Sequence, residues 1–369
     1  MSEGPVSPRR DGAWVVAFVV VCLVLVGVRI LTSRGGSGHD TAATPSPTDP
    51  SSSSSLAPGP LGQWKAVPDA PEVFEDPHLV TPSEDVVEML ERSTRLTEWP
   101  DVTNGARLDG DSFDGCDVVD DITPLCVLTP DEIDPRKVAV LLGDTTMGEA
   151  YWYMLRDTLG SRGWTLVSFT LSGCPAAVVT PVRPVVADRD PADCARHQDA
   201  YARLVAHWKP SLVVMADSED EPYSLLAGDT ATEQETRAAL GAYRGGLARA
   251  VRTVSAPGRR VLLLSPAPAQ QSASTCSAQG WTPDRCQQAP YATWFALNGI
   301  QRKVAARTGA TYADLLSFFC YQMICPSAVT KDSGDLVVRS DESHVTPEYA
   351  LFLRASFARY LRTQGIIGS

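Results

Sequence analysis

The sequence predicts an α/β fold: a mostly parallel sheet with helices on both faces, forming a three-layer α/β/α sandwich. Two observations lead to this prediction. Short apolar segments alternate along the chain with longer segments of helical periodicity, and the short segments carry few polar residues. Strands that are buried on both faces have this composition, and parallel strands joined by helical crossovers produce this alternation.

Five segments are predicted as strands. They are VAVLLGD at 138–144, TLVSFTL at 165–171, SLVVMAD at 211–217, RVLLLSP at 260–266 and a weaker ATYADL at 310–315. The spacing of apolar residues predicts helices between and after them, at 148–163, 199–208, 243–254, 295–309 and 347–361. An earlier helix is predicted at 83–96, with Ser83 and Asp85 as candidate N-caps.

The start of the chain has the composition of a membrane anchor. Residues 13–32 are almost entirely apolar and reach the length of about 20 residues that spans a bilayer. Arg29 lies near the end of this stretch, where a long side chain can extend to the interface. We therefore expect a cytoplasmic tail at 1–12 and an uncleaved anchor at 13–32. A cleaved signal peptide is the alternative, but no small-residue cleavage site follows.

The segments after the anchor differ in composition. Residues 33–66 are rich in Ser, Pro and Thr and predict a linker without a core. Residues 67–136 are acidic and interrupted by prolines, and we expect a lead-in segment packed on a main domain at 137–365. The formal net charge of −12 disfavours nucleic acid as a partner, because nucleic-acid binding requires basic surface.

The cysteines indicate an extracytoplasmic domain. Apart from Cys22 in the apolar run there are eight, an even number that suggests disulfides behind an export segment. Proximity suggests the pairs Cys116–Cys126, Cys174–Cys194, Cys276–Cys286 and Cys320–Cys325, although eight cysteines allow 105 pairings. Zinc is the alternative, but no CxxC pair occurs and Cys194 with His197 is the only close Cys and His pair. We predict no metal and no cofactor.

Polar residues follow the predicted strands. The carboxyl ends of parallel strands share one edge, where functional groups gather. The first three strands end in Gly143-Asp144-Thr145-Thr146, Ser172-Gly173-Cys174-Pro175 and Ala216-Asp217-Ser218. The acidic run that continues from Asp217 to Glu221 is typical of a solvated loop. A DxxH sequence, Asp341 to His344, precedes the last helix.

Together these segments resemble the SGNH (GDSL-type) hydrolase-like extracytoplasmic domain that is fused to acyltransferase-3 O-acyltransferases. That family has a strand ending in G-D-S-H, a later S-G-C-P, a C-x(n)-C-P segment and a D-x-x-H-[LV]-T block. This chain has GDTT at 143–146, SGCP at 172–175, FFCYQMICPSAV at 318–329 and DESHVT at 341–346. The resemblance covers about residues 85 to 361, while a single apolar run stands in place of the family's multi-helix membrane part.

The resemblance implies an SGNH-like fold and acyl-transfer chemistry. Thr145 takes the place of the nucleophilic serine, His344 is expected to accept its proton, and Asp341 to orient and stabilise the imidazolium. The backbone amides of Thr145 and Gly173 are candidate oxyanion donors.

Two further residues complete the predicted oxyanion region. Asp144 and Asp217 are its expected supporting residues. Asp217 lies where the family often has Asn or Trp, and a carboxylate there repels a developing negative charge.

The nucleophile position departs from the family pattern, because Thr145 and Thr146 replace Ser and His. The γ-methyl group of threonine restricts χ1 and crowds the attack. One hypothesis is a membrane-anchored O-acetyltransferase or esterase acting on a cell-envelope polysaccharide or glycan, alone or beside a membrane acyl-donor protein. The other is a catalytically inactive domain that binds glycan or acts as a scaffold. The surviving Asp341 and His344 favour the first.

Overall fold

The computed structural model describes residues 78–99, 117–120, 123–182, 190–227, 231–331, 334–339, 341 and 344–368. The predicted tail at 1–12, anchor at 13–32 and linker at 33–66 lie outside these residues. Within the described ranges, no helix is both long enough and apolar enough to cross a membrane.

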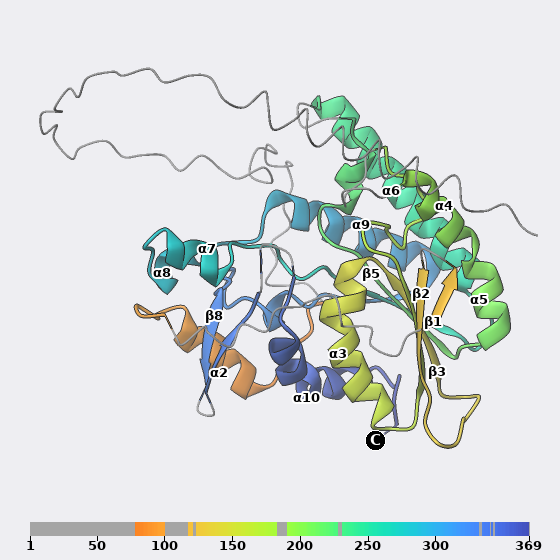
Figure 1. The fold of residues 1–369 in the computed structure, drawn as a ribbon, viewed down its shortest axis with the longest axis horizontal. Coiled ribbons are helices and arrows are strands. Elements are labelled where there is room, and N and C mark those ends of the chain that lie inside the picture. Colours follow the sequence, from red (N-terminus) through yellow and green to blue (C-terminus); the bar gives the residue numbers. More distant parts are fainter. Residues whose placement is uncertain are drawn as a thin grey trace, which may run out of the picture. The chain divides into compact units, whose positions relative to one another are not determined.

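A seven-stranded sheet forms the centre of the fold (Figure 1). In spatial order the strands are β1 (Asp117–Asp120), β2 (Thr123–Leu128), β4 (Thr165–Thr170), β3 (Val138–Gly143), β5 (Leu212–Ala216), β6 (Arg260–Leu264) and β7 (Thr311–Ala313). All pairings among β3 to β7 are parallel, whereas β2 is antiparallel to both β1 and β4. The mostly parallel sheet and all five predicted strands are confirmed.

The sheet is buried on both faces because successive side chains along a strand point to opposite sides. In β3, Ala139 and Leu141 join one hydrophobic core, while Val140 and Leu142 join the other. The helices that cover the two faces are α3 (Trp152–Leu155) and α10 (Pro347–Thr363) on the first, and α5 (Tyr201–Trp208), α6 (Glu233–Val254) and α9 (Ala292–Thr308) on the second. The predicted three layers are therefore present.

Two of the predicted helices differ in form from the expectation. The helix after β3 contains wide π-helical turns, η4 (Thr146–Tyr151) and η5 (Arg156–Gly160), on either side of α3. Helix α6 begins at Glu233, well before its predicted start at 243, because Thr232 and Glu235 form a reciprocal capping box. Another helix, α4 (Pro191–Asp199), precedes α5 and is capped by the Asp190 side chain.

The segment before residue 137 contributes to both edges of the sheet. Strands β1 and β2 extend one edge beyond β4. At the other edge Leu79 forms a parallel bridge with Asp314, next to β7. Helix α2 (Glu84–Ser93) packs against β8 (Ala328–Lys331), which forms a separate hairpin with β9 (Gly334–Val337). The lead-in segment thus includes strand pairing, which its acidic composition did not indicate.

Three of the four predicted disulfides are formed: Cys174–Cys194, Cys276–Cys286 and Cys320–Cys325. Cys126 is disulfide-bonded, and its predicted partner Cys116 lies outside the described residues.

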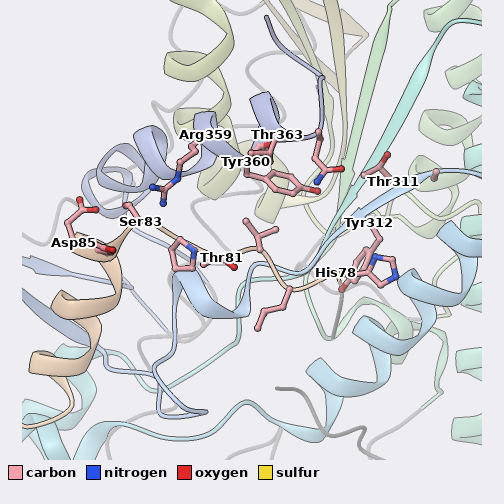
Figure 2. A pocket seen from close by; sticks show the side chains of 15 residues that line it. His78, Thr81, Ser83, Asp85, Thr311, Tyr312, Arg359, Tyr360 and Thr363 are labelled. Atoms are coloured by element: carbon pink, nitrogen blue, oxygen red, sulfur yellow. The ribbon is translucent and has the colours of Figure 1, made fainter. Parts of the chain in front are cut away.

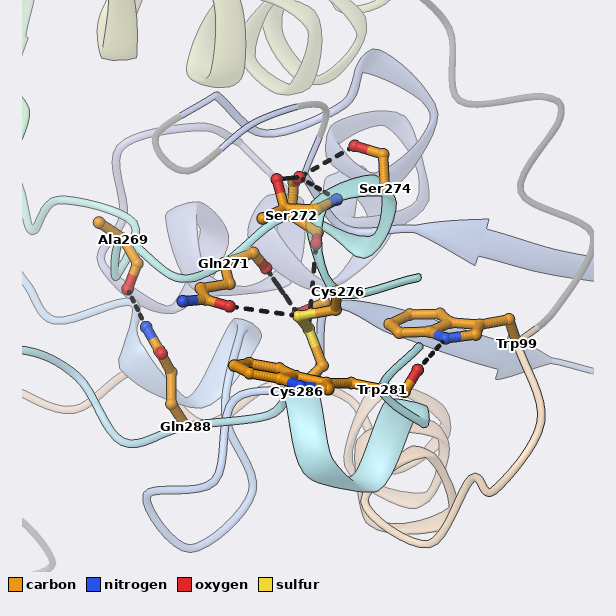
Figure 3. The surroundings of a disulfide bond; sticks show 11 residues. Trp99, Ala269, Gln271, Ser272, Ser274, Cys276, Trp281, Cys286 and Gln288 are labelled. Carbon is orange, nitrogen blue, oxygen red and sulfur yellow. Dashed lines mark hydrogen bonds between the residues drawn. A yellow bond between two sulfur atoms is a disulfide. The ribbon is translucent and has the colours of Figure 1, made fainter. Parts of the chain in front are cut away.

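Figure 3 shows the surroundings of the Cys276–Cys286 bond. The bond joins α7 (Ala273–Ala278) to α8 (Pro283–Cys286), two short helices in the segment between β6 and α9. Close by, Trp99 Nε1 donates to the carbonyl of Trp281 at 2.6 Å. This contact links the lead-in segment to the connection between α7 and α8.

Candidate active site

The carboxyl ends of three neighbouring strands lie level at one edge of the sheet. Gly143 of β3 pairs with Thr170 of β4 on one side and with Ala216 of β5 on the other. A Cβ atom on Gly143 would lie 1.9 Å from the carbonyl oxygen of Ala216, so only glycine fits there. This close approach places Asp144 and Thr145 beside the loops that follow β4 and β5.

Asp144 ties two of these loops together. Its Oδ1 accepts from the Thr146 N–H at 2.8 Å, and its Oδ2 accepts from the N–H and the hydroxyl of Ser218 at 2.8 and 2.5 Å. The side chain is buried, and this burial raises the pKa of Asp144, although the Ser218 hydrogen bonds oppose the shift. Asp144 therefore supports the edge by holding the turn of Thr145 against the β5 loop.

Thr145 is the half-buried residue directly before η4. Its hydroxyl does not cap the helix. The hydrogen bonds among the described residues include none between this hydroxyl and the His344 ring, whose Nδ1 contacts Asp341. The roles of Thr145 as nucleophile and His344 as its base remain predictions.

Gly173 forms the turn after β4. It is buried and adopts a left-handed conformation with φ of +69°, which suits glycine. The turn is closed by the Cys174 N–H, which donates to Leu171 O at 2.9 Å, and is fixed by the Cys174–Cys194 disulfide. The fold thus places Gly173 at the same edge as Thr145.

Asp217 points into the protein. Its Oδ1 accepts from the Ala176 N–H at 2.7 Å, and its Oδ2 accepts from the Tyr243 hydroxyl of α6. Burial, reinforced by the charge of Asp144, raises the pKa of Asp217 to about 7. A carboxyl group with this pKa is partly neutral near pH 7, which weakens the repulsion of an oxyanion that the sequence suggested.

The acidic run that begins at Asp217 is not a solvated loop, contrary to the sequence-based expectation. Asp217, Glu219 and Glu221 are all buried. The Oε1 atom of Glu219 accepts from the Thr293 hydroxyl at 2.6 Å, and its Oε2 accepts from the Ala269 N–H at 2.8 Å. The donors on Thr293 and Ala269 compensate part of the free-energy cost of burying the Glu219 carboxyl group.

Asp341 and His344 form a direct pair. Asp341 Oδ2 lies 2.6 Å from His344 Nδ1, and Asp341 Oδ1 accepts from the His344 backbone N–H at 2.8 Å. The His344 side chain is 29% exposed and that of Asp341 is 55% exposed. One carboxylate therefore fixes both the backbone and the ring of the histidine, in a turn that solvent can reach.

The backbone on both sides of this pair is held by longer-range contacts. Arg339 and Val345 form an antiparallel bridge, and the Thr346 N–H donates to Val338 O at 3.0 Å. Thr346 then caps α10 by accepting from the Tyr349 N–H. Because α10 packs against η4 and α3, the helices that follow the two halves of the candidate site are in contact.

A separate cavity lies at the opposite end of the sheet (Figure 2). Its lining includes His78, Asp85, Thr311 and Arg359. Thr311 is the first residue of β7, so this cavity is at the amino end of the strand and away from the candidate site. Within the described ranges, no group of three or more His, Cys, Asp or Glu residues is arranged to hold a metal ion.

The SGNH domain family, described as fused to AT3 domains, matches residues 112–359. The chain belongs to this family, as its motifs indicated, and has the family's SGNH-like α/β fold with a mostly parallel sheet. The match begins before β1, so it includes both strands of the antiparallel edge. No curated protein matches the chain.

Several solved structures have a similar fold. The periplasmic domain of a lipopolysaccharide acetyltransferase from Salmonella ser. Paratyphi A is 13% identical, with a TM-score of 0.46 over 63% of this chain and 84% of that one. A carbohydrate acetylesterase from Sinorhizobium meliloti is 15% identical, with a TM-score of 0.36 over 62% of this chain and 99% of that one. An aryl esterase from M. smegmatis is 16% identical, with a TM-score of 0.35 and the same two coverages.

Proposed function

We propose that this protein is an acyl-transfer enzyme that moves an acetyl or similar acyl group to or from a hydroxyl of a cell-envelope polysaccharide or glycan. The observation that carries the proposal is the Asp341–His344 pair, in which one carboxylate binds both the backbone N–H and Nδ1 of the histidine. A carboxylate on Nδ1 is the arrangement in which the histidine of a Ser-His-Asp triad transfers protons through Nε2. Membership of the SGNH family supports the same class of chemistry.

The first half of the proposed reaction forms an acyl-enzyme. The Thr145 oxygen attacks the ester carbonyl carbon while its proton passes to Nε2 of His344, and Asp341 stabilises the imidazolium. The backbone amides of Thr145 and Gly173 stabilise the oxyanion. When the intermediate collapses, the ester C–O bond breaks and the leaving alcohol takes the proton from His344.

The second half releases the acyl group. A water molecule or a glycan hydroxyl attacks the acyl-Thr145 carbonyl and gives its proton to His344. The Thr145 oxygen then leaves and recovers that proton. Water as the acceptor gives ester hydrolysis, whereas a glycan hydroxyl gives transfer, so the same three side chains serve both outcomes.

The proposed location is the outer side of the cell membrane, with the segment at 13–32 as a single anchor. The three disulfides formed within the described residues support an oxidising compartment. The family is described as fused to AT3 domains. We propose that a membrane acyl-donor protein supplies the acyl group for transfer.

The second candidate function is a catalytically inactive domain that binds glycan or acts as a scaffold. The observation that favours it is at the position of the predicted nucleophile, where Thr145 carries a γ-methyl group that restricts χ1 and crowds the attack. Under this alternative the Asp341–His344 pair has only a structural role.

Ester hydrolysis distinguishes the two functions. The full-length chain in detergent would be assayed with 4-nitrophenyl acetate as wild type, Thr145→Ser and His344→Ala, with Thr146→Ser as the matched control. We expect turnover in the wild type, a loss of about 10³-fold in His344→Ala, and a gain in Thr145→Ser because the γ-methyl group is removed.

Three other outcomes of the ester-hydrolysis assay would lead to different conclusions. Equal gains in Thr145→Ser and Thr146→Ser would show that the effect is not specific to the nucleophile. Activity in Thr145→Ser alone would show an intact site in which threonine does not react. Silence in every variant would contradict the enzyme and favour the binding domain.

A further inference from the structure

Arg339 is a buried cation close to the predicted catalytic pair. It lies two positions before Asp341 in the chain, and its exposed fraction is 0%. Burial lowers the pKa of Arg339 to about 10, and the negative charge of Glu219 opposes this shift. Burying a charged group costs free energy unless partners compensate for it, so the surroundings of Arg339 are informative.

The partners of Arg339 converge on the loop that follows β6. The Nη2 atom of Arg339 donates to the carbonyl of Pro268, and the carboxylate of Glu219 accepts from the N–H of Ala269 at 2.8 Å. Pro268 and Ala269 are adjacent, so a cation and a carboxylate hold the same short stretch of backbone. Further charged and titratable groups that act on Arg339 are Tyr151 of η4, Asp341 of its own segment and Tyr349 of α10.

Arg339 also begins the loop 339–345 that contains the predicted catalytic pair, and its backbone forms the base of this loop. Its antiparallel bridge with Val345 closes the segment that contains Asp341 and His344. Asp341 is more than half exposed, and its hydrogen bonds to His344 are local to this segment. The buried contacts of the base therefore connect the segment that carries this pair to the rest of the edge.

We propose that Arg339 is a positioning residue whose guanidinium, hydrogen-bonded to the Pro268 carbonyl, fixes the base of this loop and keeps Asp341 in hydrogen-bond contact with His344. The catalytic consequence rests on the proposed function. The contact itself can be measured without turnover, so the two proposals can fail separately.

The test is an NMR pH titration of the His344 ring in the full-length chain with ¹³C-labelled histidine, assigned with His344→Gln. The negative charge of Asp341 favours the imidazolium, whereas the positive charge of Arg339 opposes it. In Arg339→Met, loss of the charge alone would raise the titration midpoint. Loss of the Asp341 contact would lower it toward the midpoint of Asp341→Asn. We expect a fall of at least half of the shift that Asp341→Asn produces.

A midpoint in Arg339→Met that rises or stays unchanged would overturn the proposal. The matched control is Arg259→Met, because Arg259 donates to the carbonyls of Pro210 and Val254 at the amino end of β6, away from the pair. We expect Arg259→Met to lower the unfolding temperature without moving the midpoint. An equal fall in this control would assign the effect to general destabilisation and also overturn the proposal.

A double variant covers the case in which Arg339→Met does not fold because the positive charge near the buried carboxyl group of Glu219 is lost. Arg339→Met/Glu219→Gln removes both charges and retains an acceptor for the Ala269 N–H. The same fall in the midpoint is expected, and a rise or no change would overturn the proposal. If the midpoint falls but the wild type does not hydrolyse esters, the positioning role stands and the proposed function fails.

Discussion

The two halves of the candidate active site are built in different ways. The Thr145 half is part of the sheet: Gly143 lies against Ala216, and Asp144 is hydrogen-bonded to Ser218, far along the chain. The Asp341–His344 half is a turn whose two side chains contact each other directly and remain accessible to solvent.

This difference shows where the family pattern can change without loss of the fold. The backbone at Thr145 is fixed by Gly143 and Asp144, so a change of side chain at this position alters the hydroxyl group and not the position of the backbone. The Asp341–His344 contact lies within a segment of four residues. The comparison predicts that variants of the residues that hold Thr145 in place mainly change stability, whereas variants of Asp341 and His344 mainly change activity.

The largest expected effect is the loss of stability in Gly143→Ala. A Cβ atom 1.9 Å from the Ala216 oxygen forces β3 and β5 apart at the edge, so we expect a decrease of about 3 kcal/mol or more in the free energy of unfolding. Denaturant unfolding measures it. The control Gly258→Ala also has a positive φ, of +77°, but open space around it, and should cost only about 1 kcal/mol. Similar losses of stability in the two variants would contradict the close approach of Gly143 to Ala216.

The next effect is on activity. Asp341→Asn removes the charge that stabilises the His344 imidazolium, and we expect kcat/KM for ester hydrolysis to fall by about 10²-fold or more, with little change in unfolding temperature. Asp134→Asn is the control, because Asp134 forms a similar local ion pair with Arg136 at 3.1 Å outside the site. A large loss of stability in Asp341→Asn, with activity unchanged, would contradict the prediction that the Asp341–His344 pair mainly affects activity.

A smaller effect is expected in Ser218→Ala. The Ser218 hydroxyl donates to the buried carboxylate of Asp144 at 2.5 Å, and hydrogen bonds to charged groups contribute about 1.5 kcal/mol or more. In the control Ser224→Ala the lost hydrogen bond is to a neutral acceptor, the carbonyl of Glu221, and should cost about half as much. Denaturant unfolding of both variants measures the difference, and equal costs would indicate that Asp144 carries no charge in the folded protein.

The last prediction concerns the pH dependence of stability, which is measured as a slope across a pH range. The pKa values of Asp217 and Glu219 are raised to about 7 from ordinary values of 3.8 and 4.5, so the folded protein keeps protons that the unfolded chain releases. Their contribution to stability is present at low pH and is lost as the pH rises from about 4 to about 7. Asp217→Asn should remove part of this slope in denaturant unfolding across that range. An unchanged slope would show that Asp217 is ionised throughout.

The parts of the fold that the sequence predicts correctly are those with strong local patterns. Strands β3 to β6 are short apolar runs because both of their faces are buried. The Asp341–His344 contact follows from a spacing that one turn can close. The Cys276–Cys286 and Cys320–Cys325 pairs follow from short separations along the chain.

The parts that the sequence does not predict depend on contacts between distant residues. Nothing local to the acidic run indicates that Glu219 is buried, because its donors come from Ala269 and Thr293. Arg339 is a single charged residue after a short strand, and its carbonyl partner lies in the β6 loop. The π-helical turns around α3 have no distinct periodicity in so short a segment.

The most direct test of Thr145-based acyl transfer is to look for the acyl-enzyme. The full-length chain would be incubated with 4-nitrophenyl acetate, quenched in acid, digested and analysed by mass spectrometry, beside His344→Ala and Thr145→Ala. We predict one acetyl group on Thr145 in the wild type, strongly reduced in His344→Ala, and none at this position in Thr145→Ala. The central claim would be contradicted if wild-type protein that hydrolyses the ester carries no acetyl group on Thr145, or if the acetyl group on Thr145 forms equally well without His344.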